Sequence, residues 1–376
     1  MHAVVTKRDL VRILARCQGV ADKKSTMPIL GNVLLEVAAA DQLRLAATDL
    51  YLGVSGTISA DVEKGGSTAV GARDLFERVR MMPEGKLSLS VGNDSSLTLK
   101  AQGQPRRYTL KGIPGAEFPT LPAPSETAPV LELATEALAE LIAKTHFSIA
   151  ADDTRLHLNS ALFQWDGERI RMVTTDGHRL SKMELEAPGK SASASMLIPL
   201  KGILELKRLC EEAKNEGVTR IQLVQAGPNA FFRVPGLQLS VKLVEAQFPP
   251  YQQVIPSSTQ NRVVAKRAEL ADALKAVSVA ASDRTGGIKL MLGENVLGFQ
   301  SESPESGDGF DELEVQYSGP PLTVGFNAAY LLQVLSSIEQ DEVVLGVGGE
   351  LDPATIQPAT EAEGSHYLAV IMPMRI

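Results

Sequence analysis

Asp176 and His178 are the two side chains whose types and spacing could do acid–base chemistry. They lie two residues apart in the stretch Val173–Leu180 (VTTDGHRL). A catalytic pair of this kind needs a nucleophile or a metal beside it, and the neighbouring sequence offers neither. An Asp-Gly step after β-branched residues is a typical turn signal, in which the carboxylate accepts hydrogen bonds from nearby amides. We therefore predict that Asp176 organises a turn, with catalysis on nucleotides or nucleic acid as the alternative.

The other residues that could do chemistry are scattered along the chain. The five histidines show no HxxxH or Cys/His spacing, so we expect no metal site. The sequence also lacks a Walker lysine loop, a GxGxxG motif after a strand and a nucleophile elbow. We expect no catalytic residue and no cofactor.

The Thr-Asp pair of the predicted turn occurs a second time, at Thr48-Asp49, after a similar run of alternating apolar residues. Alternation with a period of two is typical of antiparallel strands. The stretch Arg155–Gly167 shows the same alternation, and strands are expected there as well. Because the turn recurs together with its strands, the chain is predicted to be a repeat of similar domains.

Three amphipathic helices open the three copies. Apolar residues recur at helical spacing after Thr6, Thr135 and Lys266, and Thr6 is the expected N-cap of the first helix. A second helix follows a β run in each copy, and the three stretches align without gaps. They are Thr68–Arg73 leading into Asp74–Arg80, Met196–Lys201 leading into Gly202–Arg208, and Leu322–Asn327 leading into Ala328–Val334.

Further strands close each copy, at Lys86–Val91, Arg220–Val224 and Glu342–Val347. Stretches rich in proline or serine separate the copies at Pro119–Pro129 and Pro256–Thr259. The predicted fold class is α+β, with three repeated domains that each pack two helices on antiparallel sheet. We place the three domains at residues 1–124, 125–257 and 258–376.

The composition is that of an ordinary soluble protein. The chain has 376 residues, of which 44% are hydrophobic, enough for several cores. No apolar run reaches the ~20 residues that a membrane helix needs, and the basic first helix does not resemble a secretion signal. Cys17 and Cys210 are expected to be buried free thiols, which fits a cytoplasmic protein.

The net charge of −8 is distributed unevenly. Residues 1–127 carry 16 Lys and Arg against 13 Asp and Glu, whereas residues 258–376 carry 7 against 17. A basic first domain that meets an acidic third domain would favour head-to-tail assembly. Basic residues such as Arg8, Arg12 and Arg16 also recur on the predicted helices. They indicate either solvated helix faces or a surface that contacts phosphates without reading sequence.

Five stretches, spread from the end of the first helix to the last residues, carry a resemblance. They are Thr26–Asn32 (TMPILGN), Ala47–Leu50 (ATDL), Thr174–Leu180 (TTDGHRL), Phe248–Tyr251 (FPPY) and Met372–Ile376 (MPMRI). With the three-copy layout, they resemble the bacterial sliding clamps, the β subunits of DNA polymerase III. The resemblance implies a head-to-tail homodimer that closes into a ring around duplex DNA, with helices inside and sheets outside, and that performs no chemistry of its own.

The resemblance also implies the partners. They are double-stranded DNA, encircled without sequence preference, the α subunit of the replicative polymerase, the clamp loader and other proteins with a clamp-binding motif. No membrane is implied. Two further classes stay open, the enzyme described above and a multidomain interaction scaffold without DNA contact. Gln252 and Gln253 stand where the family commonly has basic residues, and Ile376 replaces a more usual leucine.

Site residues follow from matching positions. DNA contacts are expected at Lys24, Arg73, Arg80 and Lys201 and in the loop that holds Leu156 and His157, where aromatic residues are frequent in the family. The dimer contacts are expected at Arg106, Arg107, Val279, Ala280, Glu302 and Glu305, with Asp308, Asp311 and Glu312 nearby. The pocket for partner peptides is expected at Leu158, Thr175, Gly177, His178, Arg179, Leu180, Pro249, Val254, Val370, Ile371, Met372, Pro373, Met374 and Arg375.

Overall fold

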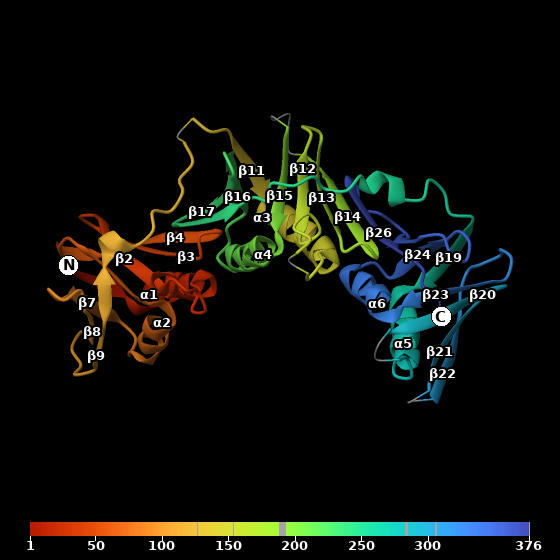
Figure 1. Cartoon of the computed structure of the whole chain (residues 1–376), viewed down its shortest axis with the longest axis horizontal. Coiled ribbons are helices and arrows are strands. Elements are labelled where there is room, and N and C mark those ends of the chain that lie inside the picture. Colours follow the sequence, from red (N-terminus) through yellow and green to blue (C-terminus); the bar gives the residue numbers. More distant parts are fainter. Residues whose placement is uncertain (126, 153, 188–192, 283–284, 305–306, 376) are drawn as a thin grey trace. The chain divides into compact units, whose positions relative to one another are not determined.

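The computed structural model in Figure 1 describes residues 1–125, 127–152, 154–187, 193–282, 285–304 and 307–375. The chain forms two compact units. The first consists of Met1–Thr135 and Arg208–Leu243, and the second of Glu136–Lys207 and Val244–Ile376. Both contain helices and antiparallel sheets, so the predicted α+β class is confirmed.

The first unit holds two antiparallel sheets and the helices α1 (Lys7–Val20) and α2 (Ala72–Met81). The smaller sheet has the order β5 (Asp61–Lys64), β1 (His2–Thr6), β7 (Lys86–Val91), β8 (Leu97–Ala101) and β9 (Arg107–Leu110). The larger has the order β10 (Gly112–Pro114), β6 (Ser67–Gly71), β2 (Asn32–Ala39), β3 (Gln42–Thr48), β4 (Leu52–Ser59), β18 (Leu237–Lys242), β17 (Asn229–Val234), β16 (Arg220–Ala226) and β11 (Val130–Ala134).

The second unit also holds two antiparallel sheets, with the helices α5 (Arg267–Ser278) and α6 (Ala328–Ser337). The larger sheet has the order β15 (Ala194–Pro199), β12 (Ser160–Trp165), β13 (Arg169–Thr175), β14 (Arg179–Glu186), β26 (Ser365–Ile371), β25 (Ala354–Pro358), β24 (Glu342–Val347) and β19 (Asn261–Lys266). The smaller has the order β22 (Gly307–Glu314), β21 (Val296–Ser303), β20 (Gly287–Gly293) and β23 (Leu322–Asn327).

The long sheets join strands from different repeats. In the first unit β4 pairs with β18, with Gly53 opposite Ser240. In the second unit β14 pairs with β26, with Leu180 opposite Val370. Each pairing satisfies backbone groups that an isolated repeat would leave at a sheet edge. The compact units therefore do not coincide with the repeats that the sequence defines.

The predicted helix starts are confirmed. Thr6 is the N-cap of α1, and its hydroxyl accepts a hydrogen bond from the Asp9 amide. Helix α3 (Thr135–Thr145) begins at Thr135, and α5 follows Lys266. The second helix of the middle repeat, α4 (Leu200–Asn215), runs beyond the predicted Arg208. Its extension carries an apolar stripe that ends in the buried Ala213.

The strand expected from Arg155 onwards is wrong at its first residues. Residues 155–159 form turns, and the first strand begins only at Ser160. The amides of Leu158 and Asn159 both donate to the Arg155 carbonyl, at 2.8 Å each. Leu156, which supplied one step of the apolar alternation, is 57% exposed. Alternation alone therefore misplaced this segment, because turns with exposed apolar residues produce the same pattern.

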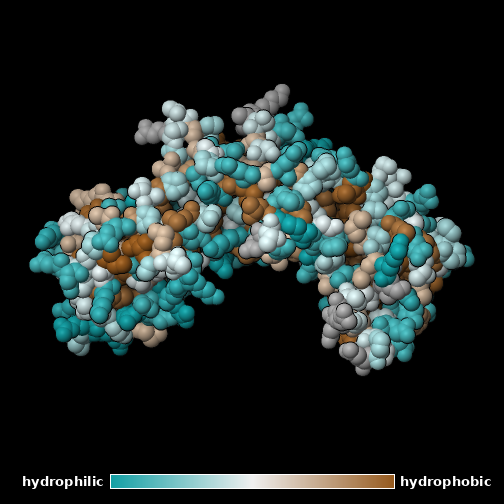
Figure 2. Space-filling view, in the orientation of Figure 1, coloured by the Kyte–Doolittle hydropathy of each residue, from teal (hydrophilic) through white to brown (hydrophobic). Residues whose placement is uncertain are grey.

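The two cysteines and the hydrophobic residues of the cores are buried, as the sequence predicts. Cys17 and Cys210 are free and buried, and burial raises the pKa of each thiol to about 12. On the face shown in Figure 2, hydrophilic residues lie between the hydrophobic ones over both units, in keeping with a mean hydropathy of zero. Within the described residues, no helix is long and apolar enough to cross a membrane.

The repeated Thr-Asp turn has the same hydrogen bonds in both copies. Asp176 Oδ1 accepts from the amides of His178 (2.9 Å) and Arg179 (3.1 Å). Asp49 Oδ1 accepts from Tyr51 (2.9 Å) and Leu52 (2.6 Å) in the same way. The threonine hydroxyl before each aspartate donates to the carbonyl four residues on. The prediction that Asp176 organises its turn is confirmed.

The two turns differ in the residue that adopts the left-handed conformation. Gly177 has φ of 94°, whereas the matching position in the first unit is Leu50, with φ of 76°. A left-handed conformation costs a residue with a side chain about 1–2 kcal/mol. We expect Leu50→Gly to leave the melting temperature unchanged or raise it, since relief of strain offsets the added flexibility of glycine. The matched change Gly177→Leu should lower the melting temperature. Equal changes in melting temperature for the two variants, measured by calorimetry, would contradict this account.

Candidate functional site

An apolar cleft of about 290 Å³ lies in the second unit, over the join of β14 and β26. One wall is the turn at residues 175–180, the second is the end of β26, and the third is the short helix Tyr251–Val254 with the prolines before it. Below it lies a buried cluster made of Leu162, Val173, Leu180, Leu197, Tyr251 and Val370.

Many of the predicted pocket residues line this cleft. They are Leu158, Thr175, Gly177, Arg179, Leu180, Pro249, Val254, Val370 and Met372. The resemblance to the clamp family placed these residues in one pocket although they come from distant parts of the chain. The sheet brings them together, because Leu180 and Val370 are opposite each other in adjacent strands.

The remaining predicted pocket residues stand beside the cleft rather than in its lining. Ile371 is fully buried, on the opposite face of β26 from Val370, as strand alternation requires. The His178 carbonyl accepts from the Met372 amide at 2.9 Å, and the Met374 amide donates to the Gly325 carbonyl at 2.9 Å. Pro373 is half-buried, and Arg375 is exposed. The two backbone hydrogen bonds hold the chain end in place.

Four lining residues were missing from the predicted pocket: His157, Pro250, Tyr251 and Gln253. Pro250 and Tyr251 belong to the FPPY stretch, so they could have been predicted from that motif. His157 was expected only as a DNA contact, and it also lines the cleft. The reason is the turn at residues 155–159, which places His157 next to the lining residue Leu158.

The charge inside the cleft is largely neutralised. Arg179 is 9% exposed, and its Nε lies 3.0 Å from Asp176 Oδ2. Burial raises the pKa of the Tyr251 hydroxyl, so this group is neutral at pH 7. A cleft with apolar walls and few polar groups can bury a hydrophobic side chain and orient the backbone around it.

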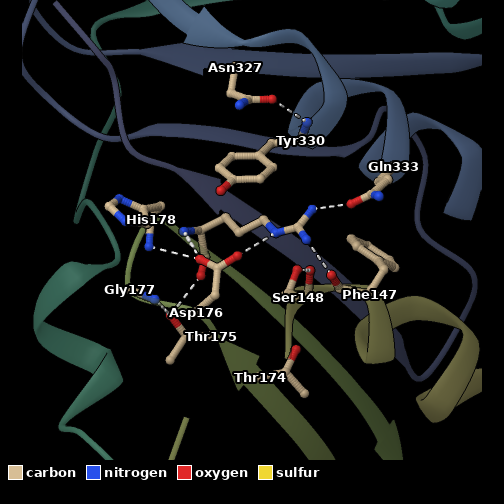
Figure 3. Close-up of polar contacts among 12 residues, drawn as sticks. Phe147, Ser148, Thr174, Thr175, Asp176, Gly177, His178, Asn327, Tyr330 and Gln333 are labelled. Atoms are coloured by element: carbon tan, nitrogen blue, oxygen red, sulfur yellow. Dashed lines mark hydrogen bonds and ion pairs between the residues drawn. The ribbon is translucent and has the colours of Figure 1, made fainter. Parts of the chain in front are cut away.

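The same contacts argue against acid–base chemistry at the turn. Both carboxylate oxygens of Asp176 already accept hydrogen bonds, from two backbone amides and from Arg179 (Figure 3). His178 is exposed and contacts this carboxylate through its backbone amide. Among the described residues, no group of three His, Cys, Asp or Glu side chains could hold a metal ion.

The residues predicted to contact DNA lie on helices and loops of both units. In the first unit Lys24 is exposed, Arg73 pairs with Glu77 at 2.7 Å, and Arg80 lies 5.6 Å from the Phe76 ring centre. In the second unit Lys201 is exposed on α4, and Leu156 is exposed in its turn.

Two arginines of the basic stripe on α1 form ion pairs within the first unit. Arg12 pairs with Glu216 at 3.1 Å, and Arg16 pairs with Glu212 and donates to the Arg208 carbonyl. The acceptors lie on α4 or just beyond its end. These two arginines are therefore largely neutralised by carboxylates within the unit. The spacing of basic residues on one helix could not reveal this, because the acidic partners are about 200 residues away.

Most of the predicted dimer residues lie at or near the edges of two sheets. Arg107 begins β9, the edge strand of the smaller sheet in the first unit, and Arg106 donates to the Met81 carbonyl. In the second unit Glu302 is on β21, and Asp308, Asp311 and Glu312 are on the edge strand β22. Val279, 82% exposed, and Ala280 follow α5. Glu305 lies outside the described residues.

Repeated α+β domains that carry an apolar cleft are the architecture of a binding protein. Family models agree along almost the whole chain. The DNA polymerase III beta subunit N-terminal domain matches residues 1–122, the central domain 132–250 and the C-terminal domain 252–375.

Individual relatives match over their full length. The beta sliding clamp of Pseudomonas aeruginosa is 32% identical over 381 residues, and that of Escherichia coli K12 is 31% identical over 378, covering 100% of both chains in each case. A solved sliding clamp from P. aeruginosa bound to griselimycin has a TM-score of 0.92 at 30% identity, again covering 100% of both chains. The chain belongs to the DNA polymerase III beta subunit family, the bacterial sliding clamps, and it is a processivity factor rather than an enzyme.

Proposed function

We propose that two copies of the chain close head-to-tail into a ring around duplex DNA and that the cleft tethers the replicative polymerase to it. The observation that carries the tethering proposal is the cleft over the join of β14 and β26. The carboxyl end of the chain forms one of its walls. Each chain forms three clamp domains, at residues 1–124, 125–257 and 258–376.

The cleft suits a short extended peptide with one apolar anchor. Leu180, Val254 and Val370 can bury an aliphatic or aromatic side chain at about 25 cal/mol per Å² of apolar surface. Such anchors usually carry most of the binding energy of an interface. The polymerase α subunit, the clamp loader and other proteins with a clamp-binding motif are the proposed partners. That the P. aeruginosa clamp binds griselimycin supports ligand binding by this family.

Ring closure brings β9 of one copy to β22 of the other. Each is the edge strand of its sheet and has unpaired backbone groups on one side. Arg106 and Arg107 would meet the acidic residues of β22. The contacts are proposed at Arg106, Arg107, Val279, Ala280, Glu302 and Glu305. We place the assembled ring in the cytoplasm, where the two free thiols remain reduced.

The DNA contacts are proposed at Lys24, Arg73, Arg80 and Lys201, with the Leu156–His157 turn close to the duplex. Changing Arg73 and Lys201 to Ala should lower DNA affinity by a similar factor for every sequence, because phosphate contacts carry no sequence information. The slope of log affinity against log salt should fall by ~0.9 for each phosphate that the variant no longer neutralises. Fluorescence anisotropy at several salt concentrations measures both effects. A decrease confined to one DNA sequence would contradict non-specific contact.

Primer extension on a long single-stranded circle tests the tethering function. With the clamp loader, ATP and the replicative polymerase from the same organism, this protein should convert short products into full-length ones. The polymerase alone and the reaction without loader serve as controls. Unchanged product length in the complete reaction, with an active polymerase and loader, would refute the proposed tethering.

A further inference from the structure

Arg179 joins three separate elements of the second unit. Its Nε donates to Asp176 of the turn at 3.0 Å, its Nη2 to the Phe147 carbonyl and its Nη1 to Gln333 Oε1 on α6. The Tyr330 ring, also on α6, lies 4.3 Å from the guanidinium carbon. Figure 3 labels these partners, namely Asp176, Phe147, Tyr330 and Gln333. A guanidinium that is 9% exposed needs such partners, because an unpaired buried charge is strongly destabilising.

The contacts of Arg179 determine the shape of the cleft, because they fix the turn that forms one of its walls. The Asp176 carboxylate that holds Arg179 also accepts the two amides that close the turn. The turn carries Gly177 and leads into Leu180, both of which line the cleft. The His178 carbonyl of the same turn holds the Met372 amide of the opposite wall. A shift of the guanidinium is therefore transmitted to both walls.

We propose that Gln333 is a positioning residue for the cleft, although it does not line the cleft itself. By fixing the Arg179 guanidinium, Gln333 sets the geometry of the turn and thereby the affinity of the cleft for peptides. Gln333 is exposed on α6, so its side chain can be changed without disturbing a core. The inference rests on the proposed peptide binding at the cleft. It adds that the affinity of the cleft is adjusted from α6, a helix that does not line it.

The test changes the charge at position 333. Gln333→Lys places an ammonium group against Arg179, and like charges at this distance repel. We expect at least a fivefold loss of affinity for a clamp-binding peptide from the replicative polymerase, measured by calorimetry. Gln333→Glu, which keeps an acceptor for the guanidinium, should retain wild-type affinity within about twofold, on the ground that a charge-assisted hydrogen bond replaces a neutral one.

Two comparisons separate positioning from a general effect of charge or stability. Ser336→Lys adds the same charge at an exposed position of α6 one turn further on and should leave the affinity unchanged. In an Arg179→Met background, Gln333→Lys should cause no additional loss, because the group it acts through is absent. Hydrogen exchange of the Met372 amide should increase in Gln333→Lys, since its acceptor His178 lies in the loosened turn.

The outcomes decide between the two proposals. If the wild-type protein does not bind the peptide, peptide capture by the cleft is wrong. If the wild-type protein binds it and Gln333→Lys binds equally well, capture stands and the positioning role of Gln333 is refuted. A similar loss in Ser336→Lys, or an additional loss in the Arg179→Met background, would also refute it.

Discussion

Deleting Met374, Arg375 and Ile376 should lower the affinity of the cleft for a polymerase-derived peptide at least tenfold, about 1.4 kcal/mol. The Met374 amide donates to the Gly325 carbonyl, and the Met372 amide donates to the His178 carbonyl. Removal of the first hydrogen bond frees the end of β26, and Met372, which lines the cleft, loses its fixed position. Ile376 itself lies outside the described residues.

Calorimetry on the truncated protein measures this effect. The Met374 amide bonds to Gly325 on β23, at the opposite edge of its sheet from β22, so sedimentation should still give the wild-type oligomeric state. The oligomeric state and the circular dichroism spectrum are expected to be unchanged. A loss of affinity can therefore be assigned to the cleft. Wild-type affinity in a correctly assembled truncated protein would mean that the chain end is not a wall of the peptide site.

Reversing Arg106 and Arg107 to Glu should convert the dimer into monomers at micromolar concentration. The change places negative charge on the edge that is proposed to face Asp308, Asp311 and Glu312, so attraction becomes repulsion. The wild-type dimer should weaken with added salt for the same reason, because charge pairs at the surface are screened over ~10 Å at 0.1 M salt.

A matched variant controls for the change in net charge. Lys100 and Lys111 are exposed and lie in or beside the same small sheet, and Lys100 is opposite Arg107 in the neighbouring strand. Their reversal to Glu changes the net charge equally, and neither residue belongs to the edge strand β9, so the dimer should persist. Analytical ultracentrifugation distinguishes the two variants. A dimer that survives both reversals and added salt would place the interface elsewhere.

Local sequence signals were sufficient for much of the fold. Thr6 predicted a helix start because capping depends on one hydroxyl and one nearby amide. The Asp176 turn followed from an equally local contact between a carboxylate and the amides after it. Their recurrence revealed the repeats, and the resemblance to clamps then brought Leu180 and Val370 into one pocket.

What the sequence could not provide are contacts between distant parts of the chain. The pairing of β4 with β18 and of β14 with β26 depends on which edges meet after each repeat has folded. The role of Arg16 depends on Glu212 of a different helix. That His157 lines the cleft was missed because its place follows from a turn that mimics strand alternation. In each case the deciding partner is absent from the local sequence pattern.

Retention on circular DNA is the measurement that tests encirclement most directly. The protein is loaded onto nicked circular DNA with the clamp loader and ATP, and the complex is separated from free protein by gel filtration in moderate salt. The ring proposal predicts that the protein stays with the circle and is lost within minutes after a restriction enzyme linearises it, because a ring slides off a free end. Equal retention on circular and linear DNA would contradict encirclement and indicate ordinary electrostatic binding.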